Sequence, residues 1–233
     1  MKILAIIPAR GGSKGILGKN IRQLSRKPLL GYTIEAALQT KTVNRIIVST
    51  DDREISDVAV KYGAEVVIRP KDISDDTSSS ESALLHVLDT LRIQENYHPD
   101  LVVFLQCTCP LTLPEDIDGA VRLLFDQQAD TAFAVTRSHF ILWKKNELGN
   151  WNGINHDKNK RLMRQQCEDQ FVETGAIYVM RVDGFLAAKN RFFGKTVGYE
   201  LPRERFCDID TPMDFFLAEQ MMIWQKDRNK KAI

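Results

Sequence analysis

Near its N-terminus the chain has a glycine-rich, basic loop directly after an apolar run. The run spans Ile3 to Ile7, and the loop reads ARGGSKGILGKN over residues 9–20. Glycines let backbone N–H groups come close to a polyanion, and the cations Arg10, Lys14 and Lys19 add positive charge. The spacing is neither that of a GxxxxGK[ST] P-loop nor that of a GxGxxG dinucleotide fold, so neither mechanism is transferred to it. We expect the loop to bind a nucleoside triphosphate.

Two carboxylates near the C-terminus have a spacing that suits a metal ion. Asp208 and Asp210 lie in the segment FCDIDTP, residues 206–212. On an extended strand, alternate side chains point to the same face, so both carboxylates can bind one hard cation. The alternative is that Asp210 supports the start of a helix at Thr211 and Pro212. Because a triphosphate substrate needs Mg²⁺, we expect the pair to bind Mg²⁺.

Polar residues also follow two other apolar runs. Asp51 follows the run 45–50, and Arg69 follows the run 66–68. We expect Asp51 to have a structural role, either as the cap of the next helix, where aspartate accepts a hydrogen bond from the first turn, or as a support behind the residues that touch a ligand. The segment DTSSS, residues 76–80, offers hydroxyl and backbone groups that suit the edge of a nucleobase. Its alternative role is to cap the helix that follows.

The opening loop resembles the N-terminal signature of the acylneuraminate cytidylyltransferases, or CMP-sialic acid synthetases, which reads roughly ARxxSKGxxxKN. The matching residues are Ala9, Arg10, Ser13, Lys14, Gly15, Lys19 and Asn20. Synthetases for the eight-carbon acid Kdo share PARxxS but continue toward RLPGKP, so the KG and KN pairs of this chain favour the nine-carbon branch. Arg69 with Pro70, the DTSSS segment and the two aspartates also resemble this family. The matches together span essentially the whole chain.

The resemblance implies a role for each of these residues in a nucleotide site. The implied triphosphate ligands are Arg10, Ser13, Lys14 and Lys19. Asn20 would contact the ribose, and Arg69 and Ser80 would contact the cytosine. Catalysis would depend on Arg10, Lys19, Asp208 and Asp210, and the two aspartates would bind Mg²⁺. The residue types alone leave a second role open for Arg69, which is to brace the end of its strand.

The same resemblance implies a sugar-binding half of the site. The segment LQCTCPL, residues 105–111, is similar to the family's LQPTSPL, with Cys107 in place of Pro and Cys109 in place of Ser. RQQ at 164–166 and TGAIY at 174–178 resemble its RQx and NGAIY pieces. The implied sugar-binding residues are Gln106, Arg164, Gln165, Tyr178, Phe192 and Phe193. An arginine suits the sugar's carboxylate. The two phenylalanines would form an apolar wall, unless they are core aromatics.

Strand-like runs alternate with segments of helical period along the chain. The expected strands are 3–7, 45–50, 66–68, 101–105, 131–135 and 176–180, and helices are expected around 30–38, 55–62, 84–91 and 117–124. Thr112 to Glu115 has the spacing of a capping box for the last helix. This alternation predicts an α/β fold, an open, doubly wound, mostly parallel sheet with helices on both faces, as in Rossmann-like nucleotidyltransferases. Ligands of such sheets bind beyond the carboxyl ends of the strands, where Gly11, Asp51, Arg69 and Gln106 would gather.

The regular alternation breaks at about residues 138–170, which contain tryptophans, asparagines and lysines without a clear period. We interpret this stretch as a small insertion in a single nucleotidyltransferase domain of residues 1–233. The resemblance implies that the insertion helps to form a homodimer and approaches the neighbouring subunit's site. The basic C-terminal residues 226–231 are interpreted as a solvated helix end.

Composition excludes several classes of protein. The 233 residues include 32 Lys and Arg against 31 Asp and Glu, so no global field attracts nucleic acid or an anionic membrane. No apolar run approaches the roughly 20 residues that span a bilayer. The four cysteines, Cys107, Cys109, Cys167 and Cys207, show neither zinc-site nor secreted-disulfide spacing. We expect a cytoplasmic protein with buried thiols, without nucleic-acid or membrane partners.

The resemblance implies a Mg²⁺-dependent enzyme that joins CMP from CTP to the anomeric hydroxyl of a nine-carbon α-keto sugar acid and releases pyrophosphate. The alternatives are a Kdo-type or other sugar nucleotidyltransferase, a dinucleotide-dependent oxidoreductase and a non-catalytic nucleotide-binding module. The acceptor is left open among N-acetylneuraminate, its deaminated analogue, and the legionaminate and pseudaminate type of bacterial acids, because Cys107, Cys109 and the pair Glu173 and Thr174 depart from the sialate pattern.

Overall fold

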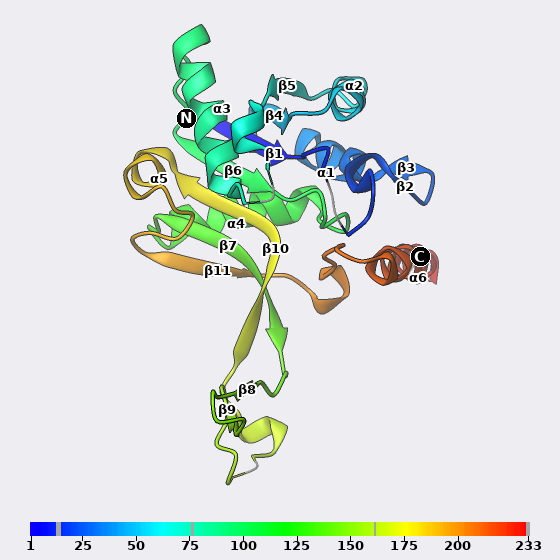
Figure 1. Ribbon diagram of the computed structural model, residues 1–233, viewed down its shortest axis with the longest axis vertical. Coiled ribbons are helices and arrows are strands. Elements are labelled where there is room, and N and C mark those ends of the chain that lie inside the picture. Colours follow the sequence, from blue (N-terminus) through cyan, green and yellow to red (C-terminus); the bar gives the residue numbers. More distant parts are fainter. Residues whose placement is uncertain (13–14, 76, 161, 232–233) are drawn as a thin grey trace.

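The computed structural model describes residues 1–12, 15–75, 77–160 and 162–231, and within them seven strands form one sheet (Figure 1). The strand order is β11-β7-β10-β6-β1-β4-β5. The strands are β1 (Ile3–Pro8), β4 (Arg45–Thr50), β5 (Glu65–Ile68), β6 (Leu101–Leu105), β7 (Thr131–Ser138), β10 (Gln170–Arg181) and β11 (Thr196–Glu200). Only β10 runs antiparallel to its neighbours. The open, mostly parallel sheet predicted from the sequence is confirmed.

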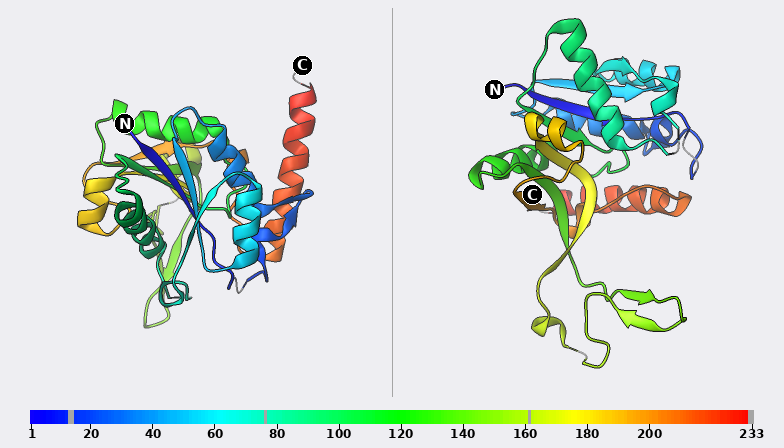
Figure 2. Two further views of the ribbon diagram at one scale, coloured as in Figure 1. Left: turned by 90° about the horizontal axis from the view of Figure 1, so that it is seen from above. Right: turned by 60° about the vertical axis from the view of Figure 1, so that its left-hand side comes forward.

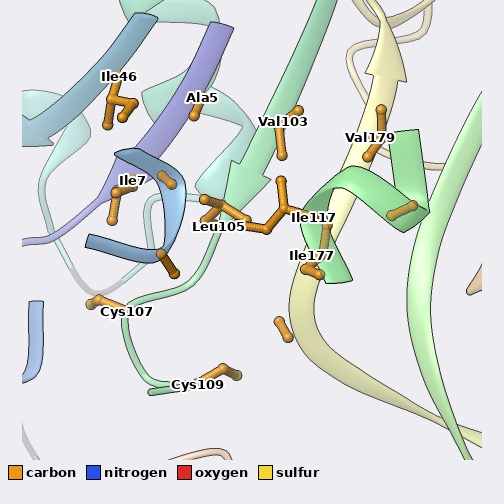
Figure 3. Close-up of a cluster of buried hydrophobic side chains, with 14 of the residues drawn as sticks. Ala5, Ile7, Ile46, Val103, Leu105, Cys107, Cys109, Ile117, Ile177 and Val179 are labelled. Carbon is orange, nitrogen blue, oxygen red and sulfur yellow. The ribbon is translucent and has the colours of Figure 1, made fainter. Parts of the chain in front are cut away.

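Helices cover both faces of this sheet, as predicted. One face carries α1 (Leu29–Leu38), α2 (Arg53–Lys61) and α4 (Pro114–Asp126), and the other carries α3 (Ser80–Glu95) and α5 (Val182–Ala188). Side chains alternate along β1, so Ala5 and Ile7 enter one core cluster and Leu4 and Ile6 the other. Figure 3 shows Ala5 and Ile7 beside Leu105 of β6 in the first cluster. Both faces of the central strands are therefore buried, as in parallel sheets generally.

The C-terminal helix α6 (Pro212–Lys231) lies at the edge of the domain (Figure 2). Phe215 and Ala218 pack against Leu24 and Leu29, which flank the short strands β2 (Gln23–Leu24) and β3 (Lys27–Pro28). Ile209 belongs to the same buried cluster. The start of α6 is thereby held next to the opening loop, although the two are almost 200 residues apart in sequence.

Strands β7 and β10 extend beyond the sheet as a twisted pair and end in a projecting segment, residues 139–169, which we call the arm (Figures 1 and 2). The arm contains the hairpin of β8 (Trp143–Lys145) and β9 (Trp151–Gly153) and the short helix η3 (Arg164–Gln166). Its exposed apolar side chains include Phe140, Ile141, Leu142, Trp143, Trp151, Leu162 and Met163. The arm matches the insertion that the sequence predicted.

Two helix caps differ from the sequence predictions. The cap of α2 is Asp52, whose carboxylate accepts from the Ile55 N–H at 2.9 Å, and not Asp51. The cap of α4 is Leu113, and the Asp116 carboxylate accepts from its N–H at 3.0 Å. Each cap lies one residue beyond the predicted position, because in each case two acids are adjacent in the sequence, Asp51 and Asp52 or Glu115 and Asp116, and the second one makes the capping bond. No helix among the described residues is long and apolar enough to cross a membrane.

The sequence predictions missed several elements. These are β2, β3, β8, β9, β11, α5 and the short helices η1 (Lys19–Ile21), η2 (Lys71–Ile73), η3 and η4 (Arg203–Arg205). All are short, and β11 contains a glycine that weakens its strand pattern.

Candidate active site

A cleft of about 530 Å³ opens at the carboxyl ends of the central strands. Eight residues predicted from the sequence line it: Arg10, Lys19, Asn20, Arg69, Ser80, Gln106, Asp208 and Asp210. They come from loops that follow β1, β5 and β6 and from the segment before α6. Ser13 and Lys14, which were also predicted, lie outside the described residues. The sheet therefore brings both predicted motifs, the opening loop and the aspartate pair, to one cavity.

Hydrogen bonds fix the start of the opening loop to its neighbours. The Gly11 N–H donates to the Asp51 carboxylate at 3.0 Å, so Asp51 holds this loop instead of capping a helix. The Asn20 amide donates to the carbonyl of Arg10 at 2.9 Å. The Arg10 guanidinium donates to the carbonyl of Asp75 at 2.6 Å. The loop is thus tied both to the end of β4 and to the turn before α3.

Lys19 connects the opening loop to the aspartate pair. Its ammonium donates to the carbonyl of Ile209 at 2.7 Å and to the Asp210 carboxylate at 3.0 Å. Gly15 lies so close to the carbonyl of Asp210 that a Cβ there would clash with it. The glycine therefore allows the close approach of the two motifs, and Lys19 holds a positive charge between them.

The two aspartates face the cleft together although their segment is not a strand of any sheet. Cys207 and Ile209 are buried, whereas Asp208 and Asp210 are exposed and line the cleft. The predicted strand was wrong, but the alternation that it implied is present, because the two apolar side chains anchor in the cluster beneath α6.

The helix start after this pair has its own acidic partner. The Asp214 carboxylate accepts from the N–H of Thr211 at 2.8 Å and from its hydroxyl at 2.8 Å, and the Thr211 hydroxyl accepts in turn from the Asp214 N–H at 3.3 Å. This is a reciprocal cap of the kind that opens helices. Asp210 is thus not needed for the cap, and its carboxylate is available to the cleft.

The electrostatics of the pair suit a cation. Although Asp208 faces the cleft, partial loss of hydration raises its pKa, and the charge of Asp210 raises it further, while a hydrogen bond from Thr108 lowers it. No group of three His, Cys, Asp or Glu side chains in the described part of the chain could hold a metal ion. Mg²⁺ commonly binds one or two carboxylates and takes its other ligands from phosphates and water. Two carboxylates beside a phosphate-binding loop fit that pattern.

Arg69 lies on the opposite wall of the cleft and is 6% exposed. Its guanidinium donates to the carbonyl of Ser49 at 2.7 Å and to the Ser49 hydroxyl at 3.2 Å. Burial lowers the pKa of Arg69. Arg69 therefore braces the end of the neighbouring strand β4, not the end of its own strand β5, and it also lines the cleft.

The residues before α3 form a turn organised by Asp75, which sequence reasoning missed. One oxygen of its carboxylate accepts from the N–H groups of Thr77 and Ser78 at 3.0 and 2.7 Å and from both hydroxyls. Ser79 caps α3 by accepting from the Ser82 N–H. Residues 78–80, which we call the serine loop, line the cleft. The segment thus both caps a helix and faces the cavity, while Asp76 lies outside the described residues.

Gln106 lines the cleft, and Gly175 of β10 lies close to its side chain. Gly175 has φ +76°, and a Cβ there would lie 2.8 Å from the Gln106 side-chain oxygen and 3.7 Å from an Asp208 oxygen. The pairing of β10 with β7 shifts register between Glu173 and Tyr178. This irregularity lets β10 approach the aspartates, and only glycine adopts that backbone readily.

The two cysteines after β6 are buried, free thiols at the edge of the core (Figure 3). The Cys107 thiol lines the cleft and donates to the side-chain oxygen of Asn20 at 3.1 Å, and the Cys109 thiol donates to the carbonyl of Thr174 at 3.5 Å. Burial raises the pKa of Cys107 to about 11. Both thiols are therefore protonated hydrogen-bond donors at neutral pH. The prediction of buried thiols holds for Cys107, Cys109 and Cys207, but Cys167 is exposed.

The predicted aromatic wall lies behind the lining residues. Tyr178 is 2% exposed, and its ring stacks on Phe104, which lines the cleft, with centroids 5.2 Å apart. Its hydroxyl donates to Glu173. Phe192 contacts Tyr178 edge-on at 6.0 Å and is 39% exposed, whereas Phe193 packs in the core. Tyr178, Phe192 and Phe193 are thus all absent from the lining of the cleft.

Arg164 and Gln165 lie apart from the cleft of their own chain. Both are exposed on η3 in the arm and are absent from the lining of the cavity. They therefore do not line the cleft of their own chain, because β7 and β10 carry the arm away from the sheet (Figure 1).

Residues 4–229 match the model of a protein family described as cytidylyltransferase. This chain belongs to the cytidylyltransferase family. The chain is 36% identical over 230 residues to zebrafish (Danio rerio) N-acylneuraminate cytidylyltransferase A, and the match covers 95% of this chain and 51% of that protein. It is 34% identical to a pseudaminic acid cytidylyltransferase of Campylobacter jejuni, covering 94% and 95%. The resemblance drawn from the motifs is confirmed.

Among further relatives, N-acylneuraminate cytidylyltransferase of Escherichia coli O18:K1:H7 is 34% identical, with 99% of this chain and 54% of that protein covered. The chain thus spans about half the length of the zebrafish and E. coli relatives. A solved structure of CMP:2-keto-3-deoxy-manno-octonic acid synthetase complexed with CTP is similar, with TM-score 0.70 and 17% identity over 97% of this chain and all of that chain. A 4-diphosphocytidyl-2C-methyl-D-erythritol synthase from Anaerococcus prevotii gives TM-score 0.69 at 16% identity, covering 95% and 98%. These likenesses support the nucleotidyltransferase fold.

Residues that sequence reasoning did not assign support the cleft of this chain. Asp75 and Thr108 support the serine loop and Asp208, and Arg191 packs behind the aromatic wall. Asp75 directly precedes a segment that was singled out, so a search for Asx turns could have found it. Nothing in the local sequence marks Arg191, because its partners are distant in the chain.

Proposed function

We propose that this chain transfers CMP from CTP to the anomeric hydroxyl of a nine-carbon α-keto sugar acid and releases pyrophosphate. The observation that carries the proposal is the cleft itself, where a basic glycine-rich loop, a buried arginine and two carboxylates meet at the strand ends. The relatives named as acylneuraminate and pseudaminic acid cytidylyltransferases support the same reaction.

In the proposed reaction, the anomeric oxygen of the acceptor attacks the α-phosphorus of CTP in line and loses its proton, and the bond to pyrophosphate breaks. Arg10 and Lys19, with Ser13 and Lys14, would bind the triphosphate and stabilise the charge that develops on it. Arg69 and Ser80 would contact the cytosine, and Asn20 the ribose. Because phosphoryl transfer offers the protein little covalent chemistry, positioning and charge neutralisation would supply most of the catalysis.

Asp208 and Asp210 are the proposed Mg²⁺ ligands. They fit this role because they face one cavity and because Asp210 is not needed for the helix cap. Burial, and then the charge of Asp210, raises the pKa of Asp208, and a bound cation would favour its charged form. When bound, Mg²⁺ would neutralise charge on the triphosphate. Lys19 holds Asp210 in the cleft through its 3.0 Å hydrogen bond.

The acceptor would bind beside Gln106 and the aromatic wall. Relatives of 33–36% identity act by name on N-acylneuraminate or pseudaminic acid, which favours a nine-carbon acid over Kdo. The deciding experiment is a pyrophosphate-release assay with CTP across N-acetylneuraminate, its deaminated analogue, legionaminate, pseudaminate and Kdo. Turnover with a nine-carbon acid supports the proposal. Turnover with Kdo alone, or CTP binding without turnover on any acid, would select one of the alternatives.

The nucleotide half can be tested separately with Arg69→Lys. Lysine keeps the positive charge but loses the planar fork of donors. If Arg69 reads the base, kcat/KM for CTP falls and the preference for CTP over UTP narrows, since polar mismatches discriminate strongly. An unchanged CTP-to-UTP ratio would leave Arg69 only its role of bracing Ser49.

We further propose that the enzyme is a cytoplasmic homodimer in which the arm reaches the neighbouring cleft. The exposed apolar side chains of the arm and the position of Arg164 and Gln165 far from their own cleft support this arrangement. The free cysteines agree with a reducing compartment. Mixing an Arg164→Met protein with an Asp210→Asn protein tests it. Recovery of activity after subunit exchange supports a shared site, and a monomeric mass by light scattering contradicts it.

A further inference from the structure

The side chain of Arg191 contacts both the first turn of α3 and the aromatic wall behind the cleft. It belongs to the loop between α5 and β11, residues 189–195, which we call the α5–β11 loop. Its guanidinium donates to the Glu81 carboxylate at 2.6 Å, across 110 positions of sequence. Both side chains are 17% exposed. Although burial alone would raise it, the pKa of Glu81 is lowered because Arg191 donates this hydrogen bond. The two form a charged, largely desolvated pair.

Glu81 ties Arg191 to the serine loop. It is the residue after Ser80 in the first turn of α3, and Ser80 lines the cleft at the proposed cytosine position. A movement of the serine loop must therefore either carry Glu81 and Arg191 along with it or break the ion pair between them, which is mostly shielded from water. Separating a buried ion pair destabilises the folded protein, because each charge is then left without a partner in surroundings that water hardly reaches.

The other face of Arg191 contacts the aromatic wall. Its guanidinium lies 5.0 Å from the ring centroid of Phe104 and 4.7 Å from that of Tyr178, at distances typical of cation–π contacts. The next residue, Phe192, contacts Tyr178 edge-on. Phe104 lines the cleft, and Tyr178 donates to Glu173 beside the irregular part of β10. Arg191 thus fixes the rings on the proposed acceptor side.

The α5–β11 loop has few other ways to move. The Phe193 ring packs so closely over Gly184 that any Cβ there would overlap it, and the Phe192 N–H donates to the Asn190 side chain at 2.8 Å. The backbone beyond Gly194 is held by Asp130, which accepts from the Lys195 N–H at 2.8 Å. With the loop anchored at these points, a displacement of Arg191 is transmitted to the rings and not absorbed by the loop.

We propose that Arg191 is a positioning residue that couples the serine loop to the aromatic wall, so that CTP binding on one side aligns the acceptor side. The inference rests on the proposed function for the identity of the two substrates. A competing role is that Arg191 binds the acceptor's carboxylate directly. Glu81 already accepts from Nε of Arg191, the guanidinium lies over two aromatic rings, and Arg191 is absent from the lining of the cleft, which together favour the coupling role.

The two roles differ in how Glu81 variants behave. Arg191→Met removes the charge and the ring contact but keeps much of the volume, and Glu81→Gln keeps an acceptor but removes the negative charge. Arg92→Met is the matched control, because Arg92 lies on the same helix in an exposed pair with Asp89, away from the cleft. Initial rates over a matrix of CTP and acceptor concentrations give the factor by which each substrate lowers the KM of the other.

We expect this factor to fall toward 1 in Arg191→Met, with a smaller fall in Glu81→Gln, from a wild-type value of about 5 to 150. The double variant should be no worse than Arg191→Met alone, because both changes remove one linkage. Arg92→Met should match the wild type. A rise only in the acceptor KM for Arg191→Met, with Glu81→Gln unaffected, would overturn the coupling and assign the carboxylate role instead.

Hydrogen–deuterium exchange separates failure of this inference from failure of the proposed function, because it needs only CTP. CTP alone should protect amides of the α5–β11 loop in the wild type and in Arg92→Met but not in Arg191→Met. CTP binding without such protection in the wild type would overturn the coupling while leaving the reaction intact. Absence of CTP binding would overturn the proposed function and this inference with it.

Discussion

Replacing Lys19 by alanine tests the phosphate side of the cleft most sharply. The Lys19 side chain is 13% exposed and that of Asp210 is 73% exposed, so water screens their ion pair, which adds about 0 to 1 kcal/mol to folding. The bond to the carbonyl of Ile209 has a charged donor and adds about 1.5 to 3 kcal/mol. At about 2–4 °C per kcal/mol for a chain of this length, the melting temperature should fall by roughly 5–15 °C.

The effect on turnover is separate from this loss of stability, because a protein that is still folded at assay temperature lacks the Lys19 donor in the cleft. Removing one donor from developing charge typically costs on the order of 10²-fold in rate, or about 3 kcal/mol. Pyrophosphate release at saturating Mg²⁺ measures it. Lys27→Ala is the matched control, because Lys27 also pairs with an acid, Glu35, and lies over the Tyr32 ring, yet is outside the cleft. A Lys19→Ala protein within about threefold of wild-type kcat/KM, or one whose defect lies only in the acceptor KM, would refute the reasoning.

Three further predictions concern the rest of the cleft. Asp208→Asn and Asp210→Asn should each lower turnover by on the order of 10³-fold with an unchanged circular dichroism spectrum, whereas Asp214→Asn should mainly lower the melting temperature. The hydrogen bond from Thr211 lowers the pKa of Asp214, so the stability that the Asp214 carboxylate gives the folded protein should be complete above about pH 4 and should vanish as the pH falls through the folded pKa. If the Asp214→Asn protein lost as much stability as the wild type over the same fall in pH, this assignment would be contradicted. Gly175→Ala should raise the acceptor KM more than the CTP KM, because φ +76° disfavours alanine and its Cβ would displace the Gln106 oxygen; equal rises in both would refute this. A thiol reagent at neutral pH should modify Cys167 rapidly and Cys107 slowly, since burial raises the Cys107 pKa to about 11; mass mapping that finds Cys107 modified first would disprove the burial argument.

The fold and the cleft could be predicted to the extent that their signals are local in sequence. Continuous apolar runs such as Leu101–Leu105 identified the central strands, and the Gly-rich loop and aspartate pair identified the cleft. The antiparallel direction of β10 could not be predicted, because a buried strand has the same pattern in either direction. Cap positions were off by one residue where two acids are adjacent, as at Asp51 and Asp52.

Properties that depend on contacts between distant segments were beyond sequence reasoning. Asp208 and Asp210 face the cleft together because Cys207 and Ile209 are buried beneath α6. The sequence predicted this alternation from a strand, which the segment does not form. The same logic explains Arg164. The sequence assigned it to the sugar, but β7 and β10 carry it away from its own cleft, so in the proposed homodimer it would meet a sugar carboxylate across the subunit boundary. A motif therefore indicates which chemistry a side chain can do, while the topology decides whose substrate it can reach.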